Sequence, residues 1–331
     1  MKKIIFIIAV LFATTSFAQE ITSGDYEGRK DVHSFIERVA ASSNYSREEL
    51  IALFSQVEKQ EHLFEKLNKP AEKELKWHQY RNIFVKEKRI SGGVKFWGEH
   101  RELLEKVYAE TGVPPEIIVA IIGVESFYGV YKGKDPVFDS LVTLAFDYPR
   151  RSKFFMQELE QFLLLAKEQG FTPRSLRGSY AGAMGMPQFI ASSYRSYAVD
   201  FDKDGRVDLF NSIPDIVGSV ANYFLRHGWQ ANGKVARPLT AVKDNAVKSL
   251  TPGVKPTYQW VEFARKGLVS KFQIGDDEKV ALIKLEQKKH PEYWAGFQNF
   301  YVITRYNHSE MYAMAVYQLA KLIRHEYKKT A

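Results

Sequence analysis

The sequence predicts a mainly α-helical fold that carries a small β-rich insertion. Apolar residues recur at helical spacing over most of the 331-residue chain, and helix start and stop signals divide that pattern into separate helices. Between residues 230 and 297 the pattern changes to β-branched and aromatic residues separated by glycine and proline, which is typical of short strands. Hydrophobic residues make up 45% of the chain and cysteine is absent, so the fold must rest on its own core rather than on disulfides.

Residues 1–18 have the composition of an export signal. Lys2 and Lys3 precede an apolar run over residues 4–12, and SFA at residues 16–18 has the small-x-small pattern that a signal peptidase cuts. A retained membrane anchor is the alternative, but the run is shorter than the roughly 20 residues that a spanning helix needs. We therefore expect cleavage after Ala18, and the absence of cysteine excludes a lipid anchor on that residue type.

The charge is modestly positive. It falls from +8 to +6 when the signal is removed, because residues 1–18 contain two lysines and no acidic residue. Such a field favours anionic partners such as acidic cell-wall polymers, nucleic acid or lipid headgroups, and a solvated basic surface without a partner fits equally well. No basic run is interleaved with aromatic residues as in nucleic-acid grooves, so we do not expect a nucleic-acid partner.

Residues 19–112 are predicted to form a helical N-terminal subdomain. In SREELIALF, Ser46 followed by Glu49 forms a capping box. The central part, residues 113–229, opens with TGVPPEIIVAIIGVES, where a helix can begin at Pro114 or Pro115 because the missing N–H does no harm there.

Two further helices are predicted in this central part, and their stop signals are glycines. RRSKFFMQELEQFLLLAKEQG is strongly amphipathic and ends at Gly170, while SIPDIVGSVANYFLRHGW ends at Gly228. The β-rich insertion over residues 230–297 follows, and residues 298–331 return to the helical core with SEMYAMAVYQLAKLIRHEY as the closing helix.

A single carboxylate interrupts the apolar helix that starts near Pro115. Glu125 is the one charged residue of AIIGVESFYG, and an ionised side chain in such surroundings is costly unless it is paired or protonated. Helical spacing places it on one face with four other residues: Ile118, Ile121, Ile122 and Tyr128. Desolvation raises a carboxyl pKa, as a general acid requires, but a buried glutamate that satisfies a backbone group or an arginine is an equally open alternative.

A glycine-rich run, GSYAGAMGMPQFIASSYRSYAVD, covers residues 178–200. Gly182 and Gly185 leave little side-chain bulk, which suits a backbone pressed against a ligand, and polar Ser179 and Gln188 bracket them. A tight turn between helices, in which the glycines serve packing alone, is the alternative and the safer interpretation of this run by itself.

The segment DFDKDGRVDLFN, which begins at Asp200, has the alternating carboxylates of an EF-hand loop. Positions three, five, six, seven, nine and twelve are Asp202, Asp204, Gly205, Arg206, Asp208 and Asn211. Carboxylates, a turn glycine and a backbone carbonyl match the oxygen ligands that calcium prefers, although Asn211 stands where a bidentate Glu is usual. A solvated acidic turn is the alternative.

Several motifs, in this order, resemble the membrane-bound lytic murein transglycosylase B family, glycoside hydrolase family 103. They are AIIGVES, LAFDYPRRSKFF, GSYAGAMGMPQFIASSY, DIVGSVANYFLRHGW and NFYVITRYNHSEMYAMAVYQL. The resemblance spans nearly all of the mature chain. It implies a lysozyme-like helical core with a helical N-terminal part and a small β insertion, and cleavage of the MurNAc–GlcNAc β-1,4 bond of peptidoglycan with formation of a 1,6-anhydro end.

The resemblance also assigns roles to residues. It places the catalytic acid/base on Glu125, and its substrate contacts fall on Tyr80, Ser179, Gln188, Tyr223, Tyr306 and Asn307. It includes a structural calcium loop over residues 200–215 whose closing carboxylate comes later than in an EF-hand, so that the ligand set becomes Asp200, Asp202, Asp204, Arg206, Asp208 and Asp215. The chain departs from relatives at Phe127, Tyr128 and Met186-Pro187, which affects the expected subsite preference rather than the reaction.

A single carboxyl suffices in the mechanism that the resemblance implies. Hydrolases normally use two carboxyls. The sequence near Glu125 offers no obvious second one, since Asp135 and Asp139 follow a loop rich in glycine and lysine, and a carboxylate distant in the sequence stays an open alternative. The N-acetyl group and C6 hydroxyl of the substrate would take over the role of the nucleophile. A lysozyme-type muramidase and a non-catalytic glycan-binding protein of the cell wall are the alternatives.

The resemblance implies a setting as well. We expect a monomer in the periplasm that binds peptidoglycan glycan strands, without a lipid anchor or a cofactor for catalysis, and that can join cell-wall enzyme complexes.

Overall fold

The computed structural model describes residues 21, 23–68, 75–241 and 246–330. The predicted signal peptide, residues 1–18, lies outside the described residues. The chain forms two compact units, of which the first ends at Glu58 and the second begins at Lys59.

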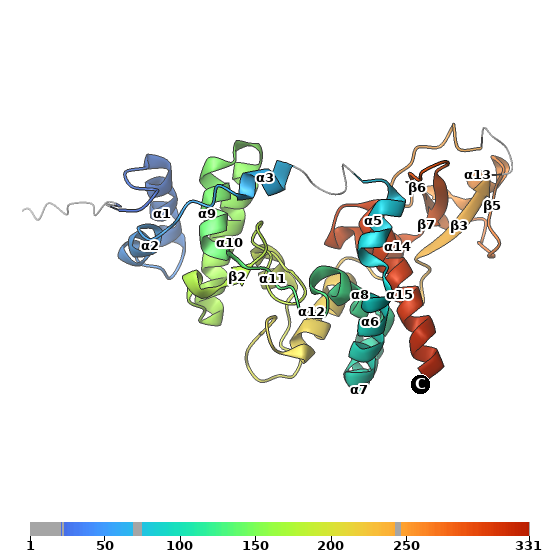
Figure 1. Ribbon diagram of the computed structural model, residues 1–331, viewed down its shortest axis with the longest axis horizontal. Coiled ribbons are helices and arrows are strands. Elements are labelled where there is room, and N and C mark those ends of the chain that lie inside the picture. Colours follow the sequence, from blue (N-terminus) through green and yellow to red (C-terminus); the bar gives the residue numbers. More distant parts are fainter. Residues whose placement is uncertain (1–20, 22, 69–74, 242–245, 331) are drawn as a thin grey trace, which may run out of the picture. The chain divides into compact units, whose positions relative to one another are not determined.

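The first unit contains α1 (Lys30–Ser42) and α2 (Arg47–Phe54), coloured blue in Figure 1. The predicted capping box opens α2: Ser46 Oγ accepts a hydrogen bond from the Glu49 N–H at 3.1 Å, and Glu49 Oε2 accepts one from the Ser46 N–H at 2.7 Å. This local signal was sufficient to locate the start of the helix.

The second unit begins with α3 (Leu63–Asn68), α5 (Trp77–Phe84), α6 (Glu87–Glu99) and α7 (Arg101–Thr111). Helices α5 and α6 pack against the C-terminal helix α15 (Glu310–Thr330), and α6 also packs against α8 (Pro115–Ser126). Residues 59–112 therefore group with the helices of the core. The sequence predicts the division at residues 112/113, whereas the contacts place it after Glu58.

Helix α8 is the central element of the second unit, with α6 and α15 beside it (Figure 1). It begins at Pro115, one of the two predicted starts, and every residue from Ile117 to Val124 is buried. The helix ends at Ser126, because Phe127 and Tyr128 adopt left-handed φ values of 52° and 59°. The prediction that Tyr128 continues the helix face of Glu125 was therefore wrong.

Further helices of the second unit follow α8 in the chain. They are α9 (Val137–Asp147), α10 (Ser152–Gln169), α11 (Ala191–Tyr197), α12 (Ile213–Arg226) and α14 (Gln298–Tyr306). Helix α10 packs against α9 and α11, and α12 packs against α7 and α8. The predicted stop signals lie where expected: Gly170 caps α10 with φ 67°, and Gly228 follows the end of α12 with φ 87°.

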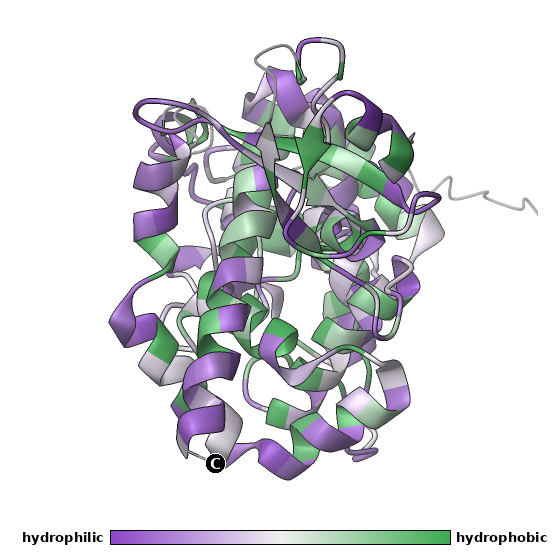
Figure 2. Ribbon diagram, turned by 90° about the vertical axis from the view of Figure 1, so that its right-hand side faces the viewer, coloured by the Kyte–Doolittle hydropathy of each residue, from purple (hydrophilic) through white to green (hydrophobic). Residues whose placement is uncertain are grey.

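The predicted β-rich insertion is a five-stranded antiparallel sheet with strand order β4-β6-β7-β3-β5 (Figure 1). Its strands are β3 (Ala236–Ala241), β4 (Tyr258–Gln259), β5 (Leu268–Val269), β6 (Lys279–Leu285) and β7 (Glu292–Gly296). Together with α13 (Trp260–Arg265) it encloses its own apolar cluster, which includes Phe263 and Leu282. Figure 2 shows hydrophobic stretches in these strands and hydrophilic turns on the outer helices.

Among the described residues, no single helix combines the length and apolar character needed to cross a membrane. One pair, α7 with α8, meets those criteria of length and composition when its two helices, bent by 113° from each other, are taken together.

Candidate active site

Glu125 lies in the last turn of α8 and is partly accessible to solvent. The hydroxyl of Tyr312, in α15, donates a hydrogen bond to Glu125 Oε1 over 2.5 Å. Burial raises the pKa of Glu125 to about 7, and the hydrogen bond from Tyr312 opposes that rise. Burial is the larger of these two influences on the pKa of Glu125.

The charge of Glu125 affects the pKa values of two tyrosines. Burial, followed by the Glu125 carboxylate, raises the pKa of both Tyr306 and Tyr312 well above the ordinary value. Tyr80, in α5, also affects the pKa of Tyr312. Tyr306 in α14 and Tyr312 in α15 therefore place two phenol groups that stay protonated near the Glu125 carboxyl.

Tyr312 is the site residue that sequence reasoning missed. It lies within the motif NFYVITRYNHSEMYAMAVYQL, six residues after Tyr306, and the helical pattern of its segment marks it only as a core residue. Its side chain is 3% exposed, as a core residue would be, but its hydroxyl meets a carboxyl 187 positions earlier in the chain.

The turn after Glu125 is held in place by Tyr128. A Cβ atom on Gly92, Gly93 or Gly123 would lie between 2.5 and 2.8 Å from Tyr128, so these glycines leave the room that its ring occupies. The Tyr128 hydroxyl donates to the Arg89 carbonyl at 2.6 Å, and Arg89 Nε donates to the Gly123 carbonyl at 2.8 Å. Tyr128 thus fixes the end of α8, and we find no role for it in a sugar subsite.

The glycines of the run 178–200 serve packing. Gly182 and Gly185 have φ values of 85° and 71°, and a Cβ would lie 2.7 Å from Leu141 in the first case and 2.4 Å from the Leu209 carbonyl in the second. Ser179 Oγ closes the turn by accepting the N–H groups of residues 181 and 183 at 3.3 and 3.0 Å. The space beside these two glycines is filled by protein, which favours the packing interpretation over close approach to a ligand.

The glycine-rich run lies directly against the turn that follows Glu125. Strands β1 (Asp135–Pro136) and β2 (Arg177–Gly178) pair in antiparallel fashion, and a Cβ on Gly133 would lie 2.0 Å from the Gly178 carbonyl carbon. Gln188 Nε2 donates to the Lys132 carbonyl at 3.2 Å and to the Gly185 carbonyl at 2.8 Å. Backbone contact thus joins two loops that are separate in the sequence.

An aromatic group connects this run with α12 and α14. The Tyr306 hydroxyl donates to the Pro187 carbonyl at 2.7 Å, and the Tyr223 hydroxyl donates to the Arg305 carbonyl at 2.6 Å. The rings of Tyr223 and Tyr306 lie 4.9 Å apart, and both contact Phe189. Asn307 follows at the exposed end of α14. The structure therefore brings Tyr223 and Tyr306 together and places them against the residues on either side of Gln188.

The acidic loop brings three of the predicted ligands together. Carboxylate oxygens of Asp200, Asp202 and Asp204 lie within 4.8 Å of one another, and Asp208 and Asp215 are not part of this group. The buried Asp215 carboxylate accepts the N–H groups of Phe201 and Asp208, each at 2.8 Å, and thereby joins both ends of the loop to the start of α12.

The family follows from comparison with known proteins. The model of the transglycosylase SLT domain matches residues 27–321. The chain belongs to this family. It is 38% identical to membrane-bound lytic murein transglycosylase B of Escherichia coli (strain K12) over 309 aligned residues. The aligned region covers 91% of this chain and 84% of that protein.

Solved structures of the family confirm the fold. Lytic transglycosylase SltB1 from Pseudomonas aeruginosa superimposes with a TM-score of 0.86 at 46% identity over 92% of this chain and 100% of that one. The Escherichia coli lytic transglycosylase SLT35, solved in complex with calcium, gives 0.85 at 38% identity over 92% of this chain and 96% of that one. The predicted resemblance and the mainly α, lysozyme-like fold with a small β-rich region are confirmed.

Proposed function

We propose that the protein is a peptidoglycan lytic transglycosylase that cleaves the MurNAc–GlcNAc β-1,4 bond and leaves a 1,6-anhydro-MurNAc end. The observation that carries the proposal is the Glu125 carboxyl, which is partly accessible, accepts a hydrogen bond from the Tyr312 hydroxyl and has its pKa raised to about 7 by burial. The names of the family relatives support the reaction class.

The first step needs a proton on Glu125. With a pKa of about 7, the carboxyl keeps its proton in a large fraction of molecules at neutral pH and can transfer it to the glycosidic oxygen as the C1–O bond breaks. The positive charge that develops at C1 is met by the N-acetyl group of the substrate. A second enzyme carboxylate is then unnecessary, in contrast to the usual pair in hydrolases.

The second step returns the proton. Glu125, now a carboxylate, removes the proton from the C6 hydroxyl, whose oxygen bonds to C1 and closes the anhydro ring. The Tyr312 hydroxyl donates to the carboxylate during this interval. Water is not consumed, and Glu125 ends the cycle protonated.

The substrate contacts are proposals that rest on the resemblance and the positions of the side chains. Ser179, Gln188, Tyr306 and Asn307 are all at least partly accessible, and Tyr306 lies near enough to Glu125 for its pKa to respond. Tyr80 is 2% exposed, so it reaches a glycan only if neighbouring side chains move. Tyr223 is buried and its hydroxyl is bonded to Arg305, which suits support of Tyr306 better than direct contact.

Product analysis tests the proposal directly. Purified peptidoglycan digested with the protein should yield muropeptides with anhydro ends, each lighter by one water than the product of hydrolysis. Mainly reducing, hydrated ends would instead establish a lysozyme-type muramidase. A protein that binds sacculi and releases no soluble muropeptides would be a glycan-binding protein of the wall.

The pH dependence should follow the protonation of Glu125. We expect kcat/KM to decrease as the pH rises above about 7, because the general acid loses its proton there. The Tyr312 hydrogen bond favours the charged carboxylate, so Tyr312→Phe should move this decrease to higher pH by roughly one unit. Tyr194→Phe, which also removes a buried hydroxyl, serves as the control and should leave the profile in place. An unchanged profile for Tyr312→Phe would show that Glu125 is not the titrating group.

We propose that the loop over residues 200–215 binds a structural calcium ion. The acidic oxygens of Asp200, Asp202 and Asp204 have the proximity and chemistry that calcium requires, and the related SLT35 was solved in complex with calcium. Arg206, through its carbonyl, Asp208 and Asp215 complete the proposed set. The ion would fix the approach of this loop to α12, and no step of the reaction involves it.

Calcium should stabilise the folded protein without driving the reaction. A calcium concentration a hundredfold above Kd should add about 2.7 kcal/mol to the free energy of unfolding and raise the Tm by several degrees. Asp200→Ala should abolish the rise, and Asp277→Ala, at an exposed aspartate in another loop, should not. Below the Tm, a chelator should leave most of the activity. A Tm that does not change with calcium would contradict the proposed calcium site.

Localisation and association remain proposals as well. The composition of residues 1–18 supports export, and the substrate class supports a periplasmic location. We propose a monomer that acts on glycan strands, alone or in complexes with other cell-wall enzymes.

A further inference from the structure

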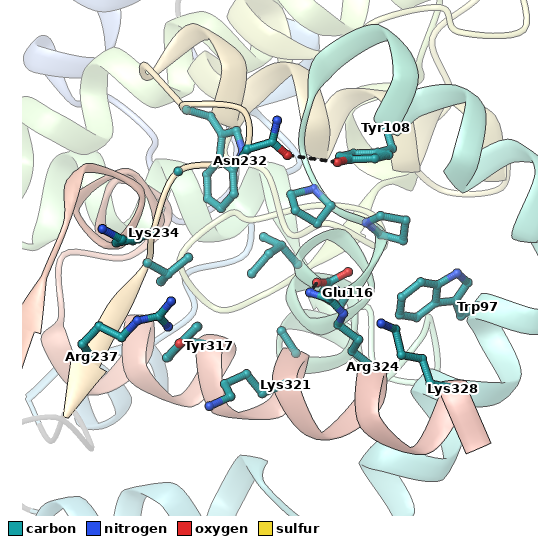
Figure 3. Close-up of a pocket in the computed structure, with 17 residues that line it drawn as sticks. Trp97, Tyr108, Glu116, Asn232, Lys234, Arg237, Tyr317, Lys321, Arg324 and Lys328 are labelled. Carbon is teal, nitrogen blue, oxygen red and sulfur yellow. Dashed lines mark hydrogen bonds and ion pairs between the residues drawn. The ribbon is translucent and has the colours of Figure 1, made fainter. Parts of the chain in front are cut away.

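A pocket of about 600 Å³ lies beside the start of α8 (Figure 3), whereas Glu125 lies in the last turn of that helix. It is bordered by the start of α8, one face of α15 and the segment that leads into β3. Glu116, which lines it, precedes Glu125 by nine residues, or roughly 14 Å along the helix axis. None of the residues predicted for the active site lines this pocket.

The lining of the pocket is strongly basic. Five of its residues are cationic and one, Glu116, is acidic; the cations are Lys234, Arg237, Lys321, Arg324 and Lys328. The last three are spaced by three and four residues and so share one face of α15 over roughly 10 Å. Figure 3 shows Lys234 and Arg237 on the opposite side of the pocket from Lys328.

Protein carboxylates neutralise only part of this charge. Arg324 pairs with Glu116 at 3.0 Å, and Lys234 pairs with Glu278. Within the described part of the chain, Arg237, Lys321 and Lys328 form no ion pair with a carboxylate. The guanidinium of Arg237 lies over the Phe272 ring at 4.8 Å and its Nη1 donates to the Ala236 carbonyl at 3.5 Å, but its Nε atom is buried and has no hydrogen-bond partner among the described residues. A buried, unpartnered guanidinium N–H is costly, and an anionic ligand would satisfy it.

Aromatic side chains line the pocket together with the cations. Trp97 stacks on Tyr327 with ring centroids 4.3 Å apart, and Trp229 Nε1 donates to the Gly112 carbonyl at 3.0 Å. Both tryptophans and Tyr317 are buried, and all three line the pocket. The pocket therefore offers fixed aromatic surface between positive groups, which suits a short chain with several anionic groups better than an isolated ion.

We propose that this pocket binds the carboxylates of a peptide stem of peptidoglycan, which makes it a second substrate site separate from Glu125. The proposal rests on the proposed function, because it takes the peptide from the same polymer. Peptide stems carry several carboxylates along a short chain, and arginine recognises a carboxylate through paired N–H donors. A membrane surface is flat and would meet the exposed lysines without reaching the recessed Arg237.

The test is a calorimetric titration of the purified protein with the stem tripeptide L-Ala-γ-D-Glu-meso-diaminopimelate. The amidated tripeptide, which lacks the carboxylates, is the ligand control. Lys321→Glu should weaken binding at least tenfold, since it replaces an attractive charge with a repulsive one at the pocket. Lys329→Glu makes the same change at an exposed lysine of α15 that does not line the pocket, and should bind like the parent. Both positions are exposed, so neither variant should impair folding.

Cleavage provides a second measurement. The ratio of cleavage rates on stem-bearing and peptide-free glycan strands should fall in Lys321→Glu and stay at the parental value in Lys329→Glu. Equal affinities of the two variants, or equal binding of the amidated peptide, would overturn the proposal. Inorganic phosphate and vesicles containing anionic lipid serve as competitors. If either binds more tightly and displaces the tripeptide, the pocket recognises another anion and the proposal is overturned.

The two proposals can fail separately. Anhydro products from a protein that does not bind the tripeptide would leave the proposed function intact and remove the second site. Tripeptide binding that depends on Lys321, in a protein that releases no anhydro products, would retain the pocket and overturn the proposed function.

Discussion

Glu125→Gln is expected to lower turnover on peptidoglycan by roughly a hundredfold to ten-thousandfold, the loss typical of a removed general acid. Glutamine keeps the volume of the side chain and an oxygen that can accept the hydrogen bond from Tyr312, but it has no proton to transfer. Binding of glycan strands should persist. Release of soluble muropeptides and co-sedimentation with sacculi, measured on one preparation, give the two quantities.

The stability of this variant separates catalysis from a structural role. Glu125 has a pKa of about 7 in the folded protein against 4.5 as the reference value, so the folded state holds the proton more tightly. The parent therefore loses stability as the pH rises from about 4.5 through 7, because the unfolded chain gives up that proton first. The difference in free energy of unfolding between Glu125→Gln and the parent should therefore shift in favour of the variant between pH 4 and pH 8, by up to about 3 kcal/mol.

A purely structural glutamate would behave differently. If Glu125 only satisfied a buried partner, glutamine would cost about 1 to 3 kcal/mol of stability and leave near-parental turnover in the folded molecules. Such a result would defeat the catalytic assignment, whatever the products of the parent enzyme are.

Gly133→Ala is expected to be the most damaging substitution apart from those at Glu125. Gly133 has φ 87°, and its Cβ would lie 2.0 Å from the carbonyl carbon and 2.1 Å from the carbonyl oxygen of Gly178. These neighbours are backbone atoms that cannot rotate away, so the glycine-rich run must shift from the turn after Glu125. We expect a loss of several kcal/mol in the free energy of unfolding and at least a tenfold loss of activity.

Gly170→Ala is the matched control. Gly170 also has a positive φ, 67°, but nothing lies within 4 Å of a Cβ placed there. Alanine at this helix end should cost only the roughly 1 to 2 kcal/mol of a left-handed residue and leave kcat unchanged. Thermal melts and muropeptide release on both variants compare the two positions. Equal effects would show that the contact between the two loops contributes nothing beyond backbone strain.

The helices were predictable because their signals are local. The capping box at Ser46, the proline at the start of α8 and the glycine that ends α10 each act through backbone groups within one helical turn. The β-rich insertion was also predictable from a local signal, its β-branched and aromatic residues separated by glycine and proline. The end of α8 was not, since it depends on Tyr128 filling space left by Gly92 and Gly93, which belong to another helix.

The division of the chain also required the structure. In sequence, the helices at residues 59–112 resemble their N-terminal neighbours. Amphipathic spacing indicates that one face of a helix is buried, but it does not indicate which element packs against that face. The structure shows that α5 and α6 contact α15 and that α6 and α7 contact α8, and residues 59–112 fall in the second compact unit.

The sequence by itself determined which residue is the candidate for the proposed acid/base. Glu125 is a lone carboxylate in an apolar helix, and its desolvation follows from its neighbours along the chain, so it could be singled out before any fold was known; the resemblance to the family then favoured the catalytic role over a structural one. What surrounds that carboxylate was decided by the tertiary structure alone. Tyr312 reaches Glu125 across 187 positions, and the basic pocket joins α15 to β3, because packing brings together residues whose spacing in the sequence contains no periodic signal.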